Sequence, residues 1–594
     1  MTNIDPAQEY RRRADARRLQ ASQLERRSII IGNLRLAVFA GGIVCAWAAL
    51  SHHRYLPLWS PVVFLLGFFA LMLWHERVTV AQRLAEKAAS VYDRGLARME
   101  DRWAGTGAMG ESYRVPDHVF ADDFDLFGRA SLFELLSTAR TPIGEATLAR
   151  WLLAPPPLAA IVERQSAVRE LSGNVDLRED LAVFGNDIAV PKDTTALLAW
   201  AEAAPVAISA GIHVVAFVLM LLAVAATVVG FVAELWTPLI VILAVEAALA
   251  WRWRKRIEAI VGPVAGAADD LALATGLLAR VEREKFESAR LRAVAVGLES
   301  AAEPPSRSMA RLKTLVNWAD SRHNMLVRFL DVPLMYSPHV AFAVERWRRA
   351  HGRSIRHWLE ALGEIEALES LAAYSYEHPD DPFPQFIERD APLFSGEELG
   401  HPLLPAGTCV RNSASLGDGT QVLLVSGSNM SGKSTFLRTI GVNAVLALAG
   451  APVRARSLRL TRLRLGASIR VTDSLQAGRS GFYAEITRLR QIMDLTFDER
   501  CVLFLADEML HGTNSHDRRI GAEGLIRALV ERGALGVVTT HDLALTAVAD
   551  GRVHNAHFQD ELRDGRMIFD YKLHEGVVTK SNALELMRSV GLDV

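Results

Sequence analysis

The sequence predicts a multidomain chain in which transmembrane helical hairpins and an all-α core domain precede a C-terminal α/β domain. Three observations predict this architecture. Apolar segments without any charged residue lie in the first half of the chain, at 56–74 and 207–233. Hydrophobic residues make up 50% of the chain and the mean hydropathy is +0.15, which is high for a soluble chain of 594 residues. At 427–432, a glycine-rich loop separates an apolar strand from a helical stretch.

Membrane crossing is predicted from segment length. The candidate segments are 29–50, 56–74, 207–233 and 236–251. At about 1.5 Å per residue, the second and third are long enough to cross a hydrocarbon core of about 30 Å. The first contains Arg35 near one end, from where its side chain can reach the interface. The fourth is short and carries Glu246, so it is the weakest candidate. The alternative is that these segments are buried helices of a soluble bundle.

Short turns, at 51–55 and 234–235, pair these segments into two hairpins. Basic residues flank the outer ends of the hairpins, at Arg11, Arg12, Arg13, Arg17, Arg18, Arg26, Arg27, Arg252, Arg254, Lys255 and Arg256. Because cytoplasmic flanks carry an excess of Lys and Arg, both ends of each hairpin are expected in the cytoplasm. The sequence therefore predicts a multi-pass protein of the inner (cytoplasmic) membrane whose C-terminal domain is cytoplasmic.

The glycine-rich loop has the features of a phosphate-binding site. It lies between the apolar run 422–425 and a helix-like stretch from Phe436. Glycines allow successive backbone N–H groups to converge on a phosphate at a helix N-terminus. The lysine is expected to reach the β- and γ-phosphates of ATP, and Ser434 to bind Mg²⁺. The predicted nucleotide-binding residues in this loop are Gly427, Asn429, Met430, Gly432, Lys433, Ser434 and Thr435.

Two further apolar runs end in polar residues. The run 501–506 leads into Asp507 and Glu508, and the run from Gly536 leads to His541. Buried parallel strands are continuous apolar runs, and ligands bind beyond their carboxyl ends. We expect Asp507 to hold Mg²⁺, Glu508 to polarise the attacking water, and His541 to sense the γ-phosphate. The alternative for His541 is a structural histidine with satisfied hydrogen bonds.

The residues between these motifs resemble the MutS family of DNA mismatch repair ATPases. The resemblance rests on Asn429-Met430, on 473–487, on 507–517, on His554-Asn555-Ala-His557 and on 579–584. It extends upstream to Leu126-Phe127-Gly128, Thr141-Pro142-Ile-Gly144 and Arg150-Trp151-Leu152, which are similar to the start of the MutS core domain. The resemblance implies a C-terminal P-loop ATPase domain of ABC type, preceded by an all-α MutS-like core.

Combining the resemblance with the apolar segments predicts the domain organisation. The expected parts are a basic cytoplasmic tail (1–28), a transmembrane hairpin (29–75), a linker (76–121), the first part of the helical core (122–205), a second transmembrane hairpin (206–252), the second part of the core with its lever (253–378) and the ATPase domain (379–594). A core helix is expected at 360–376, where leucine and isoleucine recur on one face.

In the MutS family, a loop of one subunit contacts the γ-phosphate held by the other subunit. Carried onto this chain, that contact falls to Ser480, and it implies a homodimer with two composite sites. The alternative is that Ser480 only caps the helix that follows. The family usually has threonine where this chain has Gly481.

In mismatch-reading members of the MutS family, an N-terminal domain inserts a Phe-x-Glu element beside the mispair. Residues before Asp122 contain no such element. A net charge of −2 does not by itself indicate a nucleic-acid partner. The three cysteines have no metal-ligand spacing. We therefore expect a membrane-anchored, dimeric ATPase using ATP and Mg²⁺, which acts as a DNA-binding or repair-related switch without strong mismatch preference. The alternatives are an ABC-like mechanical coupler acting on the membrane or a membrane protein, and a repair protein that finds damage through a partner.

Overall fold

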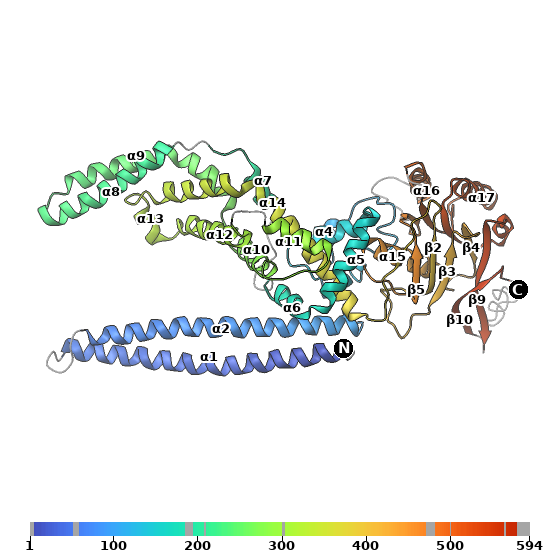
Figure 1. Cartoon of the computed structure of the whole chain (residues 1–594), viewed down its shortest axis with the longest axis horizontal. Coiled ribbons are helices and arrows are strands. Elements are labelled where there is room, and N and C mark those ends of the chain that lie inside the picture. The colour runs from blue at the N-terminus through green and yellow to red at the C-terminus, as the bar shows by residue number, and fades with distance from the viewer. Residues whose placement is uncertain are drawn as a thin grey trace. The chain divides into compact units, whose positions relative to one another are not determined.

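The structure is a computed structural model, shown in Figure 1, that describes residues 5–51, 59–184, 194–206, 210–299, 303–470, 481–498, 501–563 and 566–578. The chain forms two compact units. The first comprises residues 1–103 and 175–186, and the second comprises residues 104–174 and 187–594.

The first unit is a long helical hairpin with one short helix packed on it. Helices α1 (Pro6–Ser51) and α2 (Ser60–Met99) lie side by side along their lengths (Figure 1). In the apolar half, the rings of Phe39 and Phe68 lie 5.7 Å apart. In the charged half, Arg18 pairs with Asp93 at 2.6 Å. Helical structure extends through 6–28 and 76–99, which were predicted as a tail and a linker. Apolar packing continues there, because Ala14 and Ala88 are buried and the buried rings of Tyr10 and Tyr92 lie 5.4 Å apart.

The short helix is α6 (Val175–Phe184), which the sequence placed in the core domain at 122–205 but which packs in the first unit. Arg17 pairs with its Glu179 at 2.6 Å, and the hydroxyl of Tyr92 on α2 donates to the same carboxylate. Burial raises the pKa of Tyr92, and the neighbouring Glu179 carboxylate raises it further. Charged groups on α6 therefore fix its place against the polar half of the hairpin.

Three of the described helices are long and apolar enough to cross a membrane, judged by length and composition: α1, α2 and α8 (Ala210–Ala233). In their most apolar windows, only 11%, 6% and 22% of the residues are buried. The chain itself therefore leaves these apolar side chains uncovered, unlike the core helices of a soluble bundle. The weakest of the four predicted spans, now part of α9 (Thr237–Val261), does not meet the same criteria.

The second unit begins with a helical body built around α14 (Tyr336–Glu377), a helix of 42 residues. The other helices of the body are α3 (Leu132–Leu136), α4 (Pro142–Leu153), α5 (Leu158–Gly173), α7 (Thr194–Glu202), α10 (Ala268–Val281), α11 (Ala289–Glu299), α12 (Pro305–Ser321) and α13 (Met325–Asp331), with 3₁₀ turns η1 (Glu111–Tyr113) and η2 (Gly262–Val264). The helix expected at 360–376 is confirmed, because Ile365, Leu368 and Leu371 are buried along α14.

Two glycines of α14, Gly352 and Gly363, allow the backbones of neighbouring helices to pack closely against it. The carbonyl oxygen of Ala201 on α7 would lie 2.5 Å from a Cβ added at Gly352, and that of Ile143 on α4 would lie 2.9 Å from one at Gly363. The buried carboxylate of Glu366 accepts from the backbone N–H groups of Arg140 and Thr141 at 2.7 and 3.1 Å. Burial raises the pKa of Glu366 to about 7, although these hydrogen bonds oppose the rise.

The C-terminal part of the second unit is an α/β domain. Its strands are β1 (Gln385–Phe386), β2 (Phe394–Leu399), β3 (Asn412–Leu416), β4 (Val422–Ser426), β5 (Ser457–Leu460), β6 (Arg464–Ser468), β7 (Val502–Asp507), β8 (Leu535–Thr540), β9 (Val553–Arg563) and β10 (Arg566–Glu575). Its helices are α15 (Lys433–Ala449), α16 (Gly481–Asp498) and α17 (Ser515–Glu531), with the 3₁₀ helix η4 (Leu543–Val548).

The larger sheet has the strand order β10-β9-β4-β8-β7-β6. All neighbours in it are parallel except β10, which pairs antiparallel with β9. Strands β4, β7 and β8 are almost wholly buried, as their continuous apolar runs predicted. Because these strands are parallel neighbours, the residues that follow their carboxyl ends meet at one edge of the sheet.

We predict that Gly352→Ala destabilises the protein by about 1–3 kcal/mol, because the new methyl group meets backbone that no rotamer change can move. The matched control is Gly524→Ala on α17, where nothing lies within 4 Å of the added Cβ. This control should be neutral or stabilising by up to about 1 kcal/mol. Melting temperatures of both variants in the same detergent test the difference, and equal values would contradict the close contact.

Candidate active site

The glycine-rich loop joins β4 to α15. Gly432 has φ +101° and Met430 has φ +69°, so the loop turns through left-handed conformations just before the helix begins. A Cβ at Gly427 would lie 3.0 Å from Ser431 Oγ and 3.1 Å from the carbonyl oxygen of Phe558, so the loop is closely packed there. These backbone turns direct N–H groups of the loop and of the first turn of α15 toward the space above the sheet.

Lys433 lies inside this curl with an exposed side-chain fraction of 5%. Its Nζ donates to the carbonyl oxygens of Gly427 and Ser428 at 2.9 and 2.8 Å, and it lies 3.9 Å from Glu508 Oε1. Burial lowers the pKa of Lys433, while the carboxylates of Glu508 and Asp507 oppose that shift. A buried ammonium group is thereby held where an incoming phosphate would find a positive charge.

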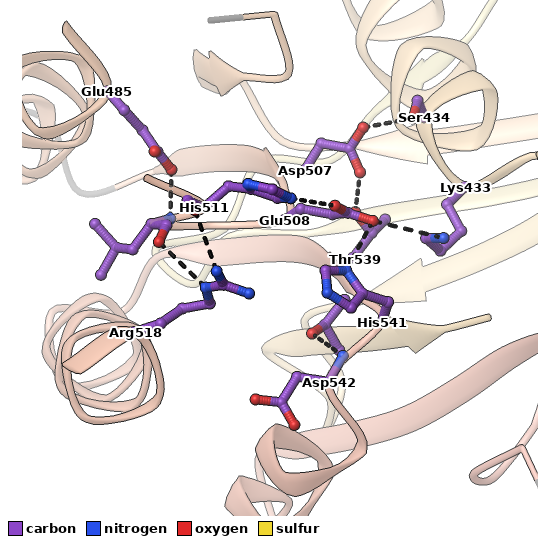
Figure 2. Close-up of polar contacts among 12 residues, drawn as sticks. Lys433, Ser434, Glu485, Asp507, Glu508, His511, Arg518, Thr539, His541 and Asp542 are labelled. Carbon is purple, nitrogen blue, oxygen red and sulfur yellow. Dashed lines mark hydrogen bonds and ion pairs between the residues drawn. The ribbon is translucent and has the colours of Figure 1, made fainter. Parts of the chain in front are cut away.

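Asp507 ends β7 and receives two hydroxyl hydrogen bonds. The Ser434 hydroxyl donates to its Oδ2, and the Thr539 hydroxyl donates to its Oδ1 (Figure 2). The structure thus brings together Ser434 and Asp507, the two predicted metal ligands. Hydroxyl and carboxylate oxygens suit Mg²⁺, which takes few protein ligands and completes its shell with water and phosphate oxygens. The residues present therefore fit Mg²⁺.

Thr539 was not among the sequence-predicted site residues. It lies directly beside Asp507 because β8 pairs with β7 in that register. The only sequence signal for Thr539 as a site residue was its position just before the end of an apolar strand. This signal is weak, because neither segment alone indicates that β7 pairs with β8.

Glu508 and two histidines form a polar cluster beyond the ends of β7 and β8. Glu508 has φ +47°, and its backbone N–H donates to the carbonyl oxygen of Thr539 at 3.1 Å. Its Oε1 lies 3.1 Å from His541 Nδ1, and its Oε2 lies 3.8 Å from His511 Nε2. His541 is 44% exposed, so it is not a buried core histidine. The sequence did not single out His511, which lies three residues after the carboxylate.

A polar frame holds the segment that follows Glu508. Glu485 on α16 is buried and accepts from the backbone N–H of Leu510, and burial raises the pKa of Glu485. Arg518 on α17 lies beside His511 (Figure 2) and donates to its carbonyl oxygen. It also donates to the carbonyl oxygens of Leu510 and Thr513. Two helices therefore fix the backbone on which Glu508 and His511 are placed.

A cavity of about 710 Å³ opens beside the loop. Lys433, Ser434, Asp507 and Glu508 line it. Its lining also includes Leu399, His401, Leu404, Thr408, Cys409, Val410, Asn412, Phe558 and Tyr571. Burial lowers the pKa of His401 to about 4, so this ring is neutral near pH 7. The lining combines charged residues, which suit phosphates, with apolar and aromatic residues, which suit a base.

Tyr571 is a further cavity residue that the sequence did not single out. Asn412 on β3 holds its backbone, because the Asn412 side-chain amide donates to the Tyr571 carbonyl oxygen at 2.9 Å. Its ring lies near the loop, with Cδ1 3.2 Å from a Cβ added at Gly432. An aromatic face in this position suits stacking on a base.

The structure describes the positions of some of the remaining predicted nucleotide-site residues but not of Ser480. Asn429, Met430 and Thr435 line the cavity with Lys433, and Met430 is 83% exposed. Ser480 lies outside the described residues, which resume at Gly481, where α16 begins. Among the described residues, no group of three or more His, Cys, Asp or Glu side chains could hold a metal ion, so Mg²⁺ would depend on Ser434, Asp507 and phosphate oxygens.

The segment that carries this site is similar to parts of known proteins. Residues 423–593 match the model of MutS domain V. The chain is 33% identical over 248 residues to "Endonuclease MutS2" of Thermus thermophilus, covering 41% of this chain and 32% of the relative. It is 30% identical over 251 residues to "DNA mismatch repair protein MutS" of Exiguobacterium sp., covering 40% and 28%. It is 32% identical over 248 residues to "DNA mismatch repair protein MutS 2" of Halobacterium salinarum, covering 39% and 27%.

The matched region thus spans less than a third of the length of each of these relatives. The matches support membership of the MutS family.

We predict that Thr539→Val raises the Mg²⁺ concentration needed for half-maximal binding of a fluorescent ATP analogue by roughly tenfold. The valine keeps the shape of the side chain and removes the hydroxyl donor to Asp507, a hydrogen bond to a charged group worth about 1.5–3 kcal/mol. Thr539→Ser restores the hydroxyl and should stay within about twofold of the unmodified protein. A valine variant with unchanged Mg²⁺ dependence would show that Thr539 does not position Asp507.

Proposed function

We propose that this chain is a membrane-anchored, MutS-like ATPase that binds ATP with Mg²⁺ and hydrolyses it as a homodimer. The observation that carries the proposal is the convergence of Lys433, Ser434, Asp507 and Glu508 at the carboxyl ends of adjacent parallel strands, around one cavity. The match to MutS domain V across the same segment supports it.

The proposed roles follow from the positions of the side chains. Lys433 neutralises the β- and γ-phosphates, and Ser434 and Asp507 hold Mg²⁺. When bound by Ser434 and Asp507, Mg²⁺ would supply neutralisation of the phosphate charge. Glu508 accepts a hydrogen bond from the attacking water, while His541, 3.1 Å from its Oε1, orients the carboxylate and faces the γ-phosphate. Tyr571 stacks on the base.

Dimerisation completes the site in this proposal. The loop is open on one side, since Met430 within it is 83% exposed. Ser480, just before α16, is the residue assigned to reach the γ-phosphate of the other subunit. A helix N-terminus adds a favourable partial charge for that contact.

Membrane anchoring is supported by the uncovered apolar surfaces of α1, α2 and α8. Exposed basic side chains, among them Arg252, Arg254 and Lys255, follow the apolar part of α9. By the excess of positive charge on cytoplasmic flanks, we assign the ATPase domain to the cytoplasmic side of the inner membrane.

Two actions are proposed for the ATPase cycle. The first is a DNA-binding or repair-related switch without strong mismatch preference, which the names of the relatives support. The second is mechanical coupling to the membrane or to a membrane protein. One observation favours it: α14 packs on α8 and α9 near its N-terminus and ends eight residues before β1 of the ATPase domain. A continuous helix can transmit a displacement between the two.

We predict that the purified protein hydrolyses ATP only with Mg²⁺. Glu508→Gln should bind ATP and lose turnover by at least about 100-fold, because the glutamine cannot accept the proton of the attacking water. Lys433→Ala should weaken nucleotide binding itself. Glu523→Gln, which alters an exposed carboxylate on α17, is the matched control and should keep full turnover. Wild-type turnover by Glu508→Gln at saturating ATP would refute its assigned role.

We predict that any DNA binding is steep in salt and weak in mismatch preference. Phosphate contacts release counterions, so affinity should fall by orders of magnitude between low and physiological salt. Homoduplex and single-mispair DNA should bind within about threefold of each other, or about 0.7 kcal/mol. Titration of the detergent-solubilised protein with both duplexes distinguishes the actions. A clear mismatch preference would favour direct repair, and no binding at low salt would favour the mechanical coupler.

A further inference from the structure

The connection between α12 and α14 exposes apolar side chains, while several of its polar groups are hydrogen-bonded to the start of α14. On α13, the exposed fractions of Met325, Phe329 and Leu330 are 73%, 76% and 52%. Trp318, near the end of α12, is 52% exposed. A water-facing connection is expected to show the opposite pattern. We call these four residues the α13 patch.

Hydrogen bonds hold the patch against the first turn of α14. The carboxylate of Asp331 accepts from the backbone N–H and the hydroxyl of Ser337 at 2.7 and 2.9 Å. The hydroxyl of Tyr336 donates to the carbonyl oxygen of Trp318 at 3.0 Å. The apolar side chains are therefore presented by a braced turn.

The patch lies at the level where α8 and α9 leave their apolar sections. The first turns of α14 pack between these two helices, and the ring of Phe342 stacks on that of His213 near the start of α8 at 4.0 Å. Pro338 and Ala341 share a small cavity with Trp253 and Ile257 near the end of α9. Figure 1 shows α13 at the same end of this unit as the α8–α9 hairpin, away from the sheets.

Exposed basic residues lie on α13 itself and near the end of α9, the helix on which the first turns of α14 pack. Arg328 lies within α13, and Arg252, Arg254 and Lys255 lie on α9. Trp251, which is 77% exposed, adds an amphipathic ring of the kind found at membrane interfaces. Anionic lipid headgroups complement this positive charge. A second copy of the same surface would bring like charges together and is disfavoured on that ground.

We propose that the α13 patch is a lipid contact, in which Met325, Phe329 and Leu330 enter the boundary between headgroups and acyl chains of the leaflet that α8 enters. This proposal rests on the membrane anchoring proposed above and adds a second contact to it. Because α13 is hydrogen-bonded to the first turn of α14, lipid contact by the patch fixes the N-terminal end of the helix that leads to the ATPase domain.

The test uses the full-length protein in vesicles of phosphatidylcholine and phosphatidylglycerol, after replacement of Cys45, Cys409 and Cys501. An environment-sensitive fluorophore is attached to Phe329→Cys, and nitroxide-labelled lipids report its depth. We expect quenching that is stronger from a nitroxide near the headgroup than from one near the chain end. Adding Leu330→Asp should reduce this quenching several-fold, because a charge disfavours insertion.

Two reference positions separate this proposal from membrane anchoring itself. Val224→Cys on α8 should be quenched best by the deep nitroxide, and Val296→Cys on α11, another exposed apolar position, should not be quenched. Quenching at 224 without quenching at 329 would overturn the lipid contact and leave the anchoring intact. Loss of quenching at both positions would overturn both. In unlabelled Phe329→Cys protein treated with an added oxidant such as copper phenanthroline, disulfide-linked dimers through residue 329, together with absent quenching in the labelled protein, would assign the patch to a second copy.

Discussion

The close approach of α14 to its neighbours is the constraint on which the second unit depends. Gly352 and Gly363 let α14 meet the backbones of α7 and α4 directly, and the buried Glu366 receives two backbone N–H groups from the segment that begins α4. A side chain at either glycine would separate these elements. Burying a carboxyl group is unfavourable, which is why its pKa is raised, but here its hydrogen bonds specify one register between two helices.

That register has consequences at both ends of the helix. At its N-terminal end, α14 packs on α8 and α9 and carries the turn that presents the α13 patch. At its C-terminal end, it leads within a few residues to β1 and the α/β domain. Under the proposed function, this continuous helix of 42 residues, with apolar helices at one end and a cavity-bearing domain at the other, offers a physical route by which nucleotide binding and the membrane can influence each other.

Within the cavity, the chemistry is set by strand register. Pairing of β7 with β8 places Thr539 opposite Asp507, and the loop between β4 and α15 brings Ser434 to the other oxygen of the same carboxylate. Glu508 then projects beyond the sheet with a left-handed backbone, between His541 and His511. Local strain of this kind persists only where surrounding contacts hold it, and Arg518 and Glu485 supply those contacts.

The sequence by itself determined the parts whose signals are local. Apolar runs ending in polar residues located the central strands, the glycine-lysine-serine loop located the helix that follows, and uncharged segments located the long apolar helices. Only the tertiary structure decided what depends on partners distant in the chain. Thr539 and Tyr571 join the site through strand pairing and through a contact with Asn412, and α6 joins the helical hairpin through ion pairs and Tyr92. The helical extension of the hairpin through 6–28 and 76–99 also depends on a distant partner, since the buried ring of Tyr10 on α1 packs on that of Tyr92 on α2. Hydrophobic periodicity indicates which face of one segment is buried. The positions of Thr539, Tyr571 and α6 depend instead on which two segments pair with each other.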